Sequence, residues 1–366
     1  MFQRMMKKAR TPSILILLLA TVGFASQDIK SPNLTPAPQT DKHRELLREA
    51  VRQHDKGNYD GAIATYLEIL KENPDDVSAL YELGFSYSAK GDYQKSLDIA
   101  NRGAQYKSDL LPGFYTLMGN DLDHLGQAEK AIKVYREGIK QFPTSVQLHY
   151  NLAIALVGVK KGDEAKKTFK DALLIKPDHP SSHFVLSQLY QNGNYKIPAL
   201  LAACRFLVLE PKTVRSASAL KMVEQLIQGG AQQGTEPNKI TIFLEPGGKT
   251  DEGDFSAVMT ALSLLAAARY LDENKNKTEI QLFVNKVSTL LAVIAESVSK
   301  QKSSGFAWDY YRPYFSEMAN RKFVEPFCYY ISQSNNSDEV ERWLTLNAER
   351  VRAFLTWSKS YQWAKR

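Results

Sequence analysis

The sequence predicts an all-α protein, in which an α-solenoid of five helix-turn-helix repeats is followed by a mainly helical C-terminal domain. Two observations carry this prediction. Landmark residues recur with a period of 34 positions across residues 43–213, and repeats of that length are typical of helical solenoids. Beyond residue 239, apolar residues recur at the three-to-four-residue spacing of amphipathic helices.

The first 25 residues have the layout of a secretory signal peptide. Basic residues up to Arg10 precede an apolar run from Ile14 to Phe24, and Ala25 offers a small residue for cleavage. The run is shorter than the roughly 20 residues that a membrane-spanning helix needs, although an uncleaved anchor is the alternative. We therefore expect an exported protein, periplasmic or secreted in a bacterium, with no stable membrane span after cleavage.

Cleavage would also change the charge of the chain. The formal net charge of +7 includes four Arg and Lys and no Asp or Glu from residues 1–25, so the remainder carries +3. So small a charge argues against nucleic acid as a partner. Residues 26–42 are predicted to be a disordered linker, because three prolines stand there among polar residues.

Prolines mark the repeat that follows. Pro143, Pro177 and Pro211 are 34 residues apart, and Pro74 lies 69 residues before the first of them. A small residue precedes each proline by twelve positions and is followed, four positions later, by Tyr, Phe or Ala. These small residues are Ala62, Ala131, Ala165 and Ala199. A small residue lets two helices approach closely, and proline ends the second helix because it has no N–H to donate.

These landmarks resemble those of the tetratricopeptide repeat, which has the same period. The first-helix pattern also matches, as in Leu80, Leu83, Gly84 and Tyr87. The resemblance divides the segment into repeats 43–76, 77–110, 112–145, 146–179 and 180–213. The second repeat lacks the proline and the aromatic residue but is still expected to be helical. The resemblance implies stacked helix pairs whose first helices line a concave groove.

The resemblance also implies which side chains face the groove. They stand at positions 5 and 9 of repeats two to five: Tyr81, Phe85, Thr116, Asn120, Tyr150, Ile154, Phe184 and Gln188. Chaperone-binding relatives carry Lys, Arg and Asn in their groove to hold a terminal carboxylate, and this set lacks that clamp. We therefore expect a protein partner that presents an apolar strand or an amphipathic helix. The alternative is that some of these aromatic residues pack against neighbouring repeats or the C-terminal half.

The rest of the chain resembles no family that we can name. Residues 214–238 are predicted to be a capping helix followed by a loop, and residues 239–366 a helical, aromatic-rich domain. A short strand is expected at 239–244 and helical periods follow, with shorter helices where Pro313 and Pro326 interrupt the aromatic stretch 306–330.

All four Trp lie in the last 59 residues, among many Tyr. A candidate aromatic site at Trp308, Tyr310, Tyr311 and Tyr314 could stack on sugar rings. The C-terminal domain would then bind or hydrolyse glycans of a cell wall. The alternative is that these large rings form the core of the domain.

Residues 247–250, Gly-Gly-Lys-Thr, stand between a predicted strand and a predicted helix, as a phosphate-binding loop would. The full motif needs Gly where this chain has Phe243, so an ordinary turn is the simpler interpretation. Asp251, Glu252 and Asp254 could touch a cation, but they fit an acidic helix start better.

Catalytic groups are sparse in the sequence. The last of the six His is His183, so the C-terminal half lacks the commonest general base. His179 and His183 are spaced for one helix face but have no clear third metal ligand. Neither Cys204 nor Cys328 has the context of a nucleophile, and the two could be an oxidised pair or buried thiols. We therefore expect a scaffold or adaptor of cell-envelope assembly or maintenance, not an enzyme, with no cofactor and no metal.

Overall fold

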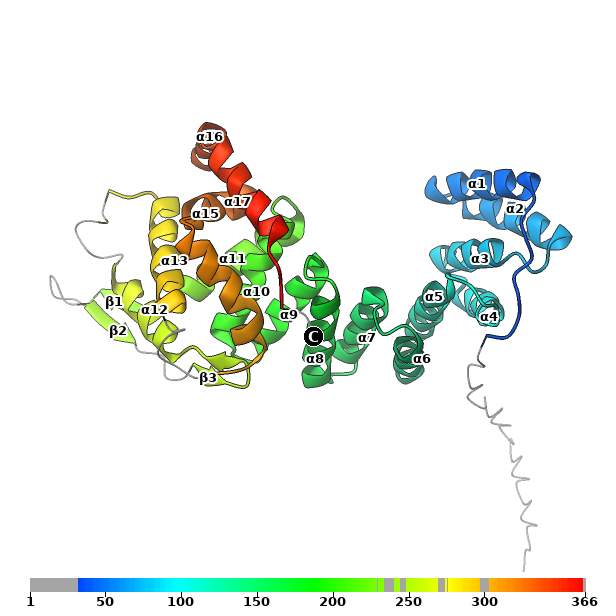
Figure 1. Cartoon of the computed structure of the whole chain (residues 1–366), viewed down its shortest axis with the longest axis horizontal. Coiled ribbons are helices and arrows are strands. Elements are labelled where there is room, and N and C mark those ends of the chain that lie inside the picture. Colours follow the sequence, from blue (N-terminus) through cyan, green and yellow to red (C-terminus); the bar gives the residue numbers. More distant parts are fainter. Residues whose placement is uncertain are drawn as a thin grey trace, which may run out of the picture.

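The computed structural model describes residues 32–228, 230–233, 240–243, 248–268, 274, 276–296 and 303–364. The predicted signal peptide lies outside these ranges. Within them, the first ten helices form an arc of five consecutive pairs (Figure 1). The pairs are α1 (Asp41–Asp55) with α2 (Tyr59–Glu72), α3 (Val77–Lys90) with α4 (Tyr93–Gly103), α5 (Leu111–His124) with α6 (Ala128–Gln141), α7 (Val146–Gly158) with α8 (Gly162–Ile175), and α9 (Pro180–Asn192) with α10 (Lys196–Leu209).

The arrangement confirms the predicted solenoid. Helices α3, α5, α7 and α9 lie on the inner side of the arc, and α4, α6 and α8 lie on its outer side (Figure 1). The small landmark residues of the second helices, such as Ala62 and Ala165, are wholly buried. The aromatic residues four positions after these two, Tyr66 and Phe169, are wholly buried as well. One helix pair cannot cover its own apolar stripe, so each pair packs on the next.

Local sequence sets where the helices begin and end. The Asp76 carboxylate accepts a hydrogen bond from the backbone N–H of Ala79 at 3.0 Å and so caps α3. Gly91 ends that helix with a φ of +90°, a left-handed conformation that few other residues adopt without strain.

The second repeat is helical, as expected, although it lacks the proline. Helix α4 ends early, at Gly103, where the Phe114 ring of the next helix occupies the space of a side chain. A Cβ atom on Gly103 would lie 2.2 Å from that ring. Gly103 therefore lets α4 and α5 approach closely at the end of this repeat.

The segment before the first repeat differs from the predicted disordered linker. The Asn33 and Leu34 N–H groups donate to the Gln105 carbonyl at 3.0 Å, and the Ala37 N–H donates to the Asp75 carbonyl at 3.1 Å. The prolines hold residues 32–40 in an extended form, and extended backbone can pair with the loops that end repeats one and two. This part of residues 26–42 is therefore an ordered strap on the solenoid.

The C-terminal region continues from the last repeat and is mainly helical, as predicted. It begins with α11 (Val214–Gln228). A strand, β1 (Gly230–Gln233), lies in the predicted loop and pairs antiparallel with β2 (Ile240–Phe243), the predicted short strand. The remaining elements are β3 (Lys249–Thr250), β4 (Gly253–Asp254), α12 (Ser256–Ala268), α13 (Glu279–Glu296), the π-helix η3 (Ala307–Tyr311), α14 (Arg312–Asn320), α15 (Val324–Ile331), the 3₁₀-helix η4 (Ser332–Asn335), α16 (Asp338–Leu346) and α17 (Ala348–Ser360).

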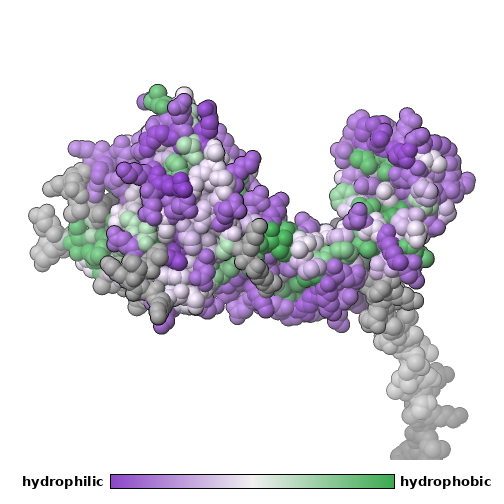
Figure 2. Space-filling view, viewed as in Figure 1, coloured by the Kyte–Doolittle hydropathy of each residue, from purple (hydrophilic) through white to green (hydrophobic). Residues whose placement is uncertain are grey.

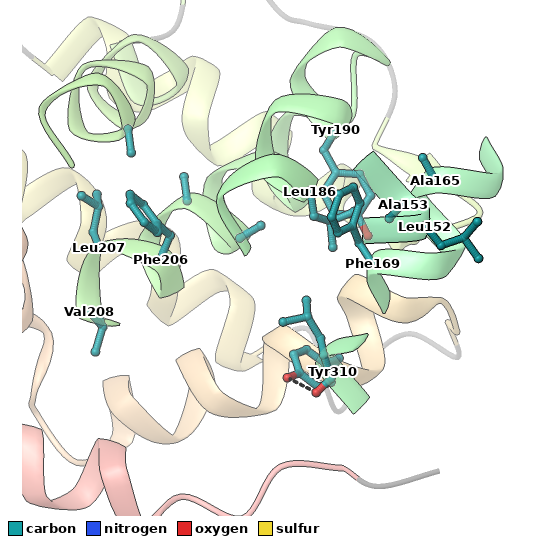
Figure 3. Packing of buried hydrophobic residues seen from close by; sticks show 14 of the residues in the cluster. Leu152, Ala153, Ala165, Phe169, Leu186, Tyr190, Phe206, Leu207, Val208 and Tyr310 are labelled. Carbon is teal, nitrogen blue, oxygen red and sulfur yellow. Dashed lines mark hydrogen bonds between the residues drawn. The ribbon is translucent and has the colours of Figure 1, made fainter. Parts of the chain in front are cut away.

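Helix α10 joins the two halves. Every residue from Ile197 to Val208 is buried, because α9 covers one side and α11, α15 and η3 cover others. Figure 3 shows Phe206, Leu207 and Val208 in the same packed region as residues of the earlier repeats and Tyr310. A helix that is apolar on all sides needs such a covering. The solenoid and the C-terminal region therefore share one core. Within the described ranges, no helix is long and apolar enough to cross a membrane.

Candidate functional site

The eight predicted groove residues lie on α3, α5, α7 and α9, the helices on the inner side of the arc. None of the eight is buried. Phe85 is 45% exposed and Ile154 is 37% exposed, which is unusual for large apolar side chains in a packed solenoid. Apolar side chains also show as green patches on the surface of the arc between the two ends of the molecule (Figure 2). We call the surface formed by these eight residues the concave groove.

The N-terminal end of the groove is aromatic. The Phe85 ring stacks on the His54 ring of α1, with 4.9 Å between centroids, and the parallel Tyr81 ring lies 6.5 Å away. Tyr81 in turn meets the edge of Phe114. The His54 Nδ1 atom and the Ser86 hydroxyl are 2.8 Å apart, which holds the imidazole in place. Phe85 is therefore oriented by its neighbours and still accessible.

The middle of the groove is polar. The Asn120 side-chain oxygen accepts hydrogen bonds from the Tyr135 hydroxyl at 2.6 Å and from the Asn151 amide at 3.1 Å. Thr116 is half-buried one turn before it. Asn120 therefore joins repeats three and four, and the exposed Ile154 supplies the apolar surface beside it.

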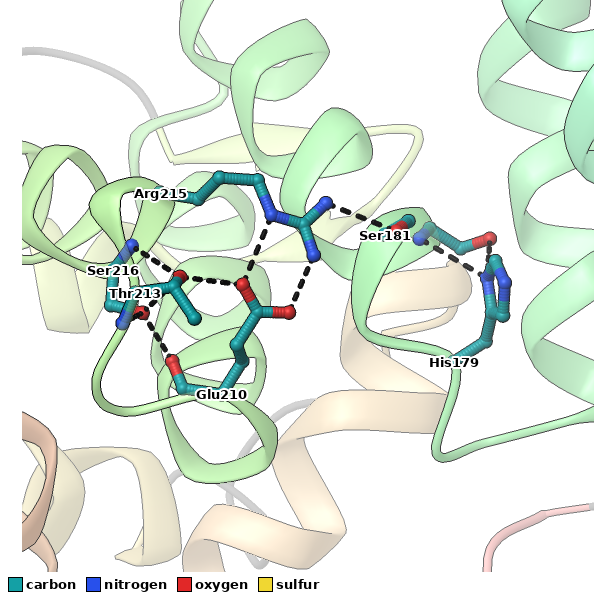
Figure 4. A network of polar contacts seen from close by, with 7 residues as sticks. His179, Ser181, Glu210, Thr213, Arg215 and Ser216 are labelled. Atoms are coloured by element: carbon teal, nitrogen blue, oxygen red, sulfur yellow. Dashed lines mark hydrogen bonds and ion pairs between the residues drawn. The ribbon is translucent and has the colours of Figure 1, made fainter. Parts of the chain in front are cut away.

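The C-terminal end of the groove is covered in part by a residue of α11. The Arg215 guanidinium lies over the Phe184 ring, 5.6 Å from its centroid, and donates to the Ser181 hydroxyl at 3.0 Å and through Nε to Glu210 at 3.0 Å. Figure 4 shows this network, together with His179 at the start of α9. Phe184 therefore packs partly against the C-terminal half, as the alternative interpretation expected, while Gln188 is exposed.

The two spaced histidines do not form a metal site. The His183 Nε2 atom lies 2.9 Å from the Pro177 carbonyl, which can only accept, so Nε2 carries the proton and Nδ1 accepts from the Tyr311 hydroxyl at 2.8 Å. The His179 Nδ1 atom accepts from the Ser182 N–H. Both side chains are thus used in packing and capping, and across the described residues no group of three or more potential ligands could hold a metal.

A buried carboxylate joins the solenoid to the C-terminal region. Glu252 is wholly buried. It pairs with the Lys170 ammonium of α8, and it accepts hydrogen bonds from the Tyr190 hydroxyl of α9 at 2.8 Å and from the Ala307 N–H at 3.2 Å. Sequence reasoning placed Glu252 in an acidic helix start. That role belongs to Asp254, which caps α12 through Ser256, and the hydrogen bonds from Ser256 lower the pKa of Asp254.

The candidate aromatic site in the C-terminal region is core. Trp308, Tyr310, Tyr311 and Tyr314 are between 0 and 3% exposed. A sugar can stack only on an accessible ring face, so the prediction of a glycan-binding surface at these residues is wrong. These rings pack inward, in part against α10, which carries the buried Arg205.

The Arg205 guanidinium lies 5.1 Å from the Tyr314 ring centroid and 4.9 Å from that of Trp363, and it donates to the Ser358 hydroxyl at 3.0 Å. The aromatic rings therefore enclose a cation of the solenoid.

The Gly-Gly-Lys-Thr segment forms a tight hairpin in its described part. Lys249 and Thr250 form β3, which pairs with β4. Gly248 has a φ of +118°, and a Cβ atom there would lie 2.5 Å from the backbone nitrogen of Ser256. The glycine therefore serves the close approach of the hairpin to α12, which agrees with the interpretation as a turn.

Both cysteines are buried free thiols. Burial raises the pKa of Cys204 and, well above its ordinary value, that of Cys328. A thiol with a raised pKa is a poor nucleophile.

A cavity of about 370 Å³ lies between α11, α13 and α16, with Glu224, Glu279 and Glu339 among its lining residues. None of these three carboxylates is buried. Glycosidases need a general acid in an apolar environment and a second carboxylate facing it across the scissile bond. The cavity therefore does not supply the site that a hydrolase would require.

The structure adds groove residues that sequence reasoning missed. Arg215 lies near the start of α11 and covers the groove residue Phe184, and Glu82 follows directly after Tyr81 on α3, close enough for its charge to act on that residue. Extending the 34-residue period past Pro211 could have found Arg215. Glu82 could have been found only from its neighbours in space.

Comparison with known proteins agrees with the fold of the N-terminal half. Residues 52–91 match a family model described as TPR repeat, and residues 124–189 match one described as tetratricopeptide repeat. Among solved structures, TTC0263, a thermophilic TPR protein of Thermus thermophilus, is 26% identical, with a TM-score of 0.42, over 49% of this chain and 99% of its own.

Two further structures are similar in the same way. MamA of Desulfovibrio magneticus RS-1 is 19% identical, with a TM-score of 0.40, over 47% of this chain and 97% of its own. The pilF protein of Pseudomonas aeruginosa is 16% identical, with a TM-score of 0.42, over 51% of this chain and 90% of its own.

Proposed function

Since the N-terminal half of this chain is built of tetratricopeptide repeats, we propose that the protein is an exported scaffold or adaptor that binds a protein partner in its concave groove. Tetratricopeptide repeats generally mediate protein–protein interaction, and the fold is typically a non-catalytic scaffold. The observation that carries the proposal is the row of accessible apolar side chains on the inner helices. Phe85, Ile154 and Val157 are each at least 36% exposed along α3 and α7.

The partner that fits this surface is an apolar strand or an amphipathic helix. The eight predicted groove positions carry aromatic, aliphatic, amide or hydroxyl side chains, so they offer contact area and no charge. The described part of the C-terminal region covers α10, while the groove residues on the inner helices of repeats two to four stay at least partly exposed. It thereby directs the partner to the inner side of the arc.

Replacing Phe85 and Ile154 together with alanine should weaken partner binding at least tenfold, because buried aromatic and aliphatic anchors dominate interface energies. Both side chains are exposed, so the fold should survive, which circular dichroism can check. The measurement is capture of partners from the cell envelope of the source organism, followed by titration of the captured protein. The matched control replaces exposed apolar residues away from the groove: Leu67, Leu264 and Leu346. Equal binding by both variants would contradict the groove proposal.

Export rests on residues 1–25, whose basic start and apolar run are those of a signal peptide. The full chain expressed in its source should appear outside the cytoplasm, with a new N-terminus at Ser26. A chain that begins at residue 26 should stay in the cytoplasm. Fractionation with N-terminal sequencing measures both, and an intact N-terminus on cytoplasmic protein would exclude export by this signal. We extend the proposal to a role in cell-envelope assembly or maintenance, because an exported scaffold would meet its partners there.

A further inference from the structure

We propose that the N-terminal end of the groove, formed by His54, Asp55, Tyr81, Glu82 and Phe85, binds an arginine side chain of the partner, next to an apolar residue. We call these five residues the N-terminal subsite. The inference rests on the proposed function, because it names the chemistry that the same groove would recognise. It adds a charge requirement to a surface that the groove positions alone present as uncharged.

The first step is the state of the Glu82 carboxylate. Glu82 is half-buried on α3, between the groove residues Tyr81 and Phe85. Within the described part of the chain, no hydrogen bond or ion pair joins Glu82 to another residue, whereas the half-buried Glu210 is paired with Arg215. Burial of an ionised carboxylate without a partner costs free energy. The folded protein therefore holds a carboxylate whose stabilising partner is missing.

The neighbours of Glu82 make its charge less favourable still. Burial, and then the nearby Asp55 carboxylate, raise the pKa of Glu82. Burial and then the Glu82 charge likewise raise the pKa of both Tyr66 and Tyr81. Beneath the groove, Tyr66 is wholly buried. The subsite is thus negative and has no cation of its own.

The second step is the aromatic surface beside the carboxylate. The Phe85 ring is 45% exposed and is held by the His54 ring at 4.9 Å. Aromatic faces attract cations, and the planar guanidinium of arginine can stack on a ring while it donates two hydrogen bonds to a carboxylate. Lysine offers only a point charge, so a ring next to a carboxylate favours arginine. The same combination is found elsewhere among the described residues, for example where Arg215 pairs with Glu210 and covers Phe184 at the other end of the groove.

The experiment pans a library of random twelve-residue peptides against the full chain. Peptides that Phe85→Ala no longer binds are groove ligands, and we expect them to be enriched in arginine beside an apolar residue. One such peptide is then titrated, with its arginine intact or replaced by citrulline, which keeps the shape and removes the charge. Glu82→Gln and the arginine-to-citrulline change should each weaken binding about tenfold or more, and the two together should weaken it little further. Glu68→Gln, on the outer helix α2, is the control and should leave binding unchanged.

The stability of Glu82→Gln separates a binding role from a structural one. Removal of an unpaired, half-buried charge should leave the melting temperature equal or higher, so a lower one would overturn the inference. The arginine subsite would also be overturned if the groove ligands lacked arginine. It would likewise be overturned if the losses of affinity from Glu82→Gln and from the citrulline change simply multiplied. In both cases the proposed function of the groove would remain. If no selected peptide depends on Phe85, the proposed function fails together with the subsite.

Discussion

Replacing Glu252 with alanine should lower the free energy of unfolding of the C-terminal region by about 3 kcal/mol, because it breaks a buried ion pair and leaves its partners without an acceptor. The carboxylate pairs with Lys170 and accepts from Tyr190 and Ala307. The side chain of Lys170 is 20% exposed. Water can therefore reach part of the orphaned ammonium, which places the effect at the lower end for such pairs.

Tryptophan fluorescence during urea unfolding measures this change selectively, because all four Trp lie between residues 308 and 363. Trp308 also contacts this site, since its backbone N–H donates a hydrogen bond to the backbone carbonyl of Glu252 at 2.9 Å. Glu252→Gln keeps the shape and should cost less. The double change Glu252→Ala with Lys170→Met should cost less than the sum of its parts, because the two groups are coupled. If the free energy of unfolding of Glu252→Ala, measured by fluorescence, lies within about 1 kcal/mol of the wild-type value, Glu252 does not hold the two halves together.

Acidification should destabilise the junction through His183. Burial, and then the Arg205 charge, lower the pKa of His183 from 6.5 to about 3 in the folded protein. The unfolded chain therefore binds a proton that the folded chain excludes. The contribution of neutral His183 to the free energy of unfolding is fully present above pH 6.5. It is lost as the pH falls toward 3, by about 1.4 kcal/mol for each pH unit.

The free energy of unfolding, measured by tryptophan fluorescence at several pH values between 7 and 4.5, checks this prediction. The His183→Gln variant cannot take up this proton. Its free energy of unfolding should therefore fall less steeply as the pH drops, and the difference in slope should correspond to about one proton per molecule. The exposed His124→Gln is the control and should keep the slope of the wild type. If the free energy of unfolding of His183→Gln falls as steeply with acid as that of the wild type, groups other than His183 cause the loss of stability.

Much of the fold was predictable because solenoid repeats are local. Ala62, Tyr66 and Pro74 meet residues of their own repeat or the next one, so their spacing along the chain reflects their contacts directly. For the same reason, positions 5 and 9 could be placed on the inner helices before the structure was known. The strap at residues 32–40 was missed, because proline-rich polar segments look alike whether or not a neighbouring loop offers hydrogen bonds.

The aromatic residues of the C-terminal region show the opposite case. Tyr310, Tyr314 and Trp363 look equally suited to a sugar site and to a core, since an aromatic ring can serve either. Their burial follows from packing on α10, which lies about a hundred residues or more earlier in the sequence. One signal was available in the sequence, because the run from Ile197 to Val208 is apolar on all sides except for Arg205 and so had to be covered by another part of the chain.

The sequence by itself therefore determined the solenoid and the helices on which the eight predicted groove residues lie, because both depend on residues within about 34 positions of one another. Only the tertiary structure decided the roles of Glu252, Arg205 and His183, and the presence of an unpaired carboxylate at Glu82. The burial and charge of these groups depend on neighbours from distant segments or adjacent helices. A one-dimensional pattern carries no information on such distances, and it is the distances that set the free energy of a buried charge.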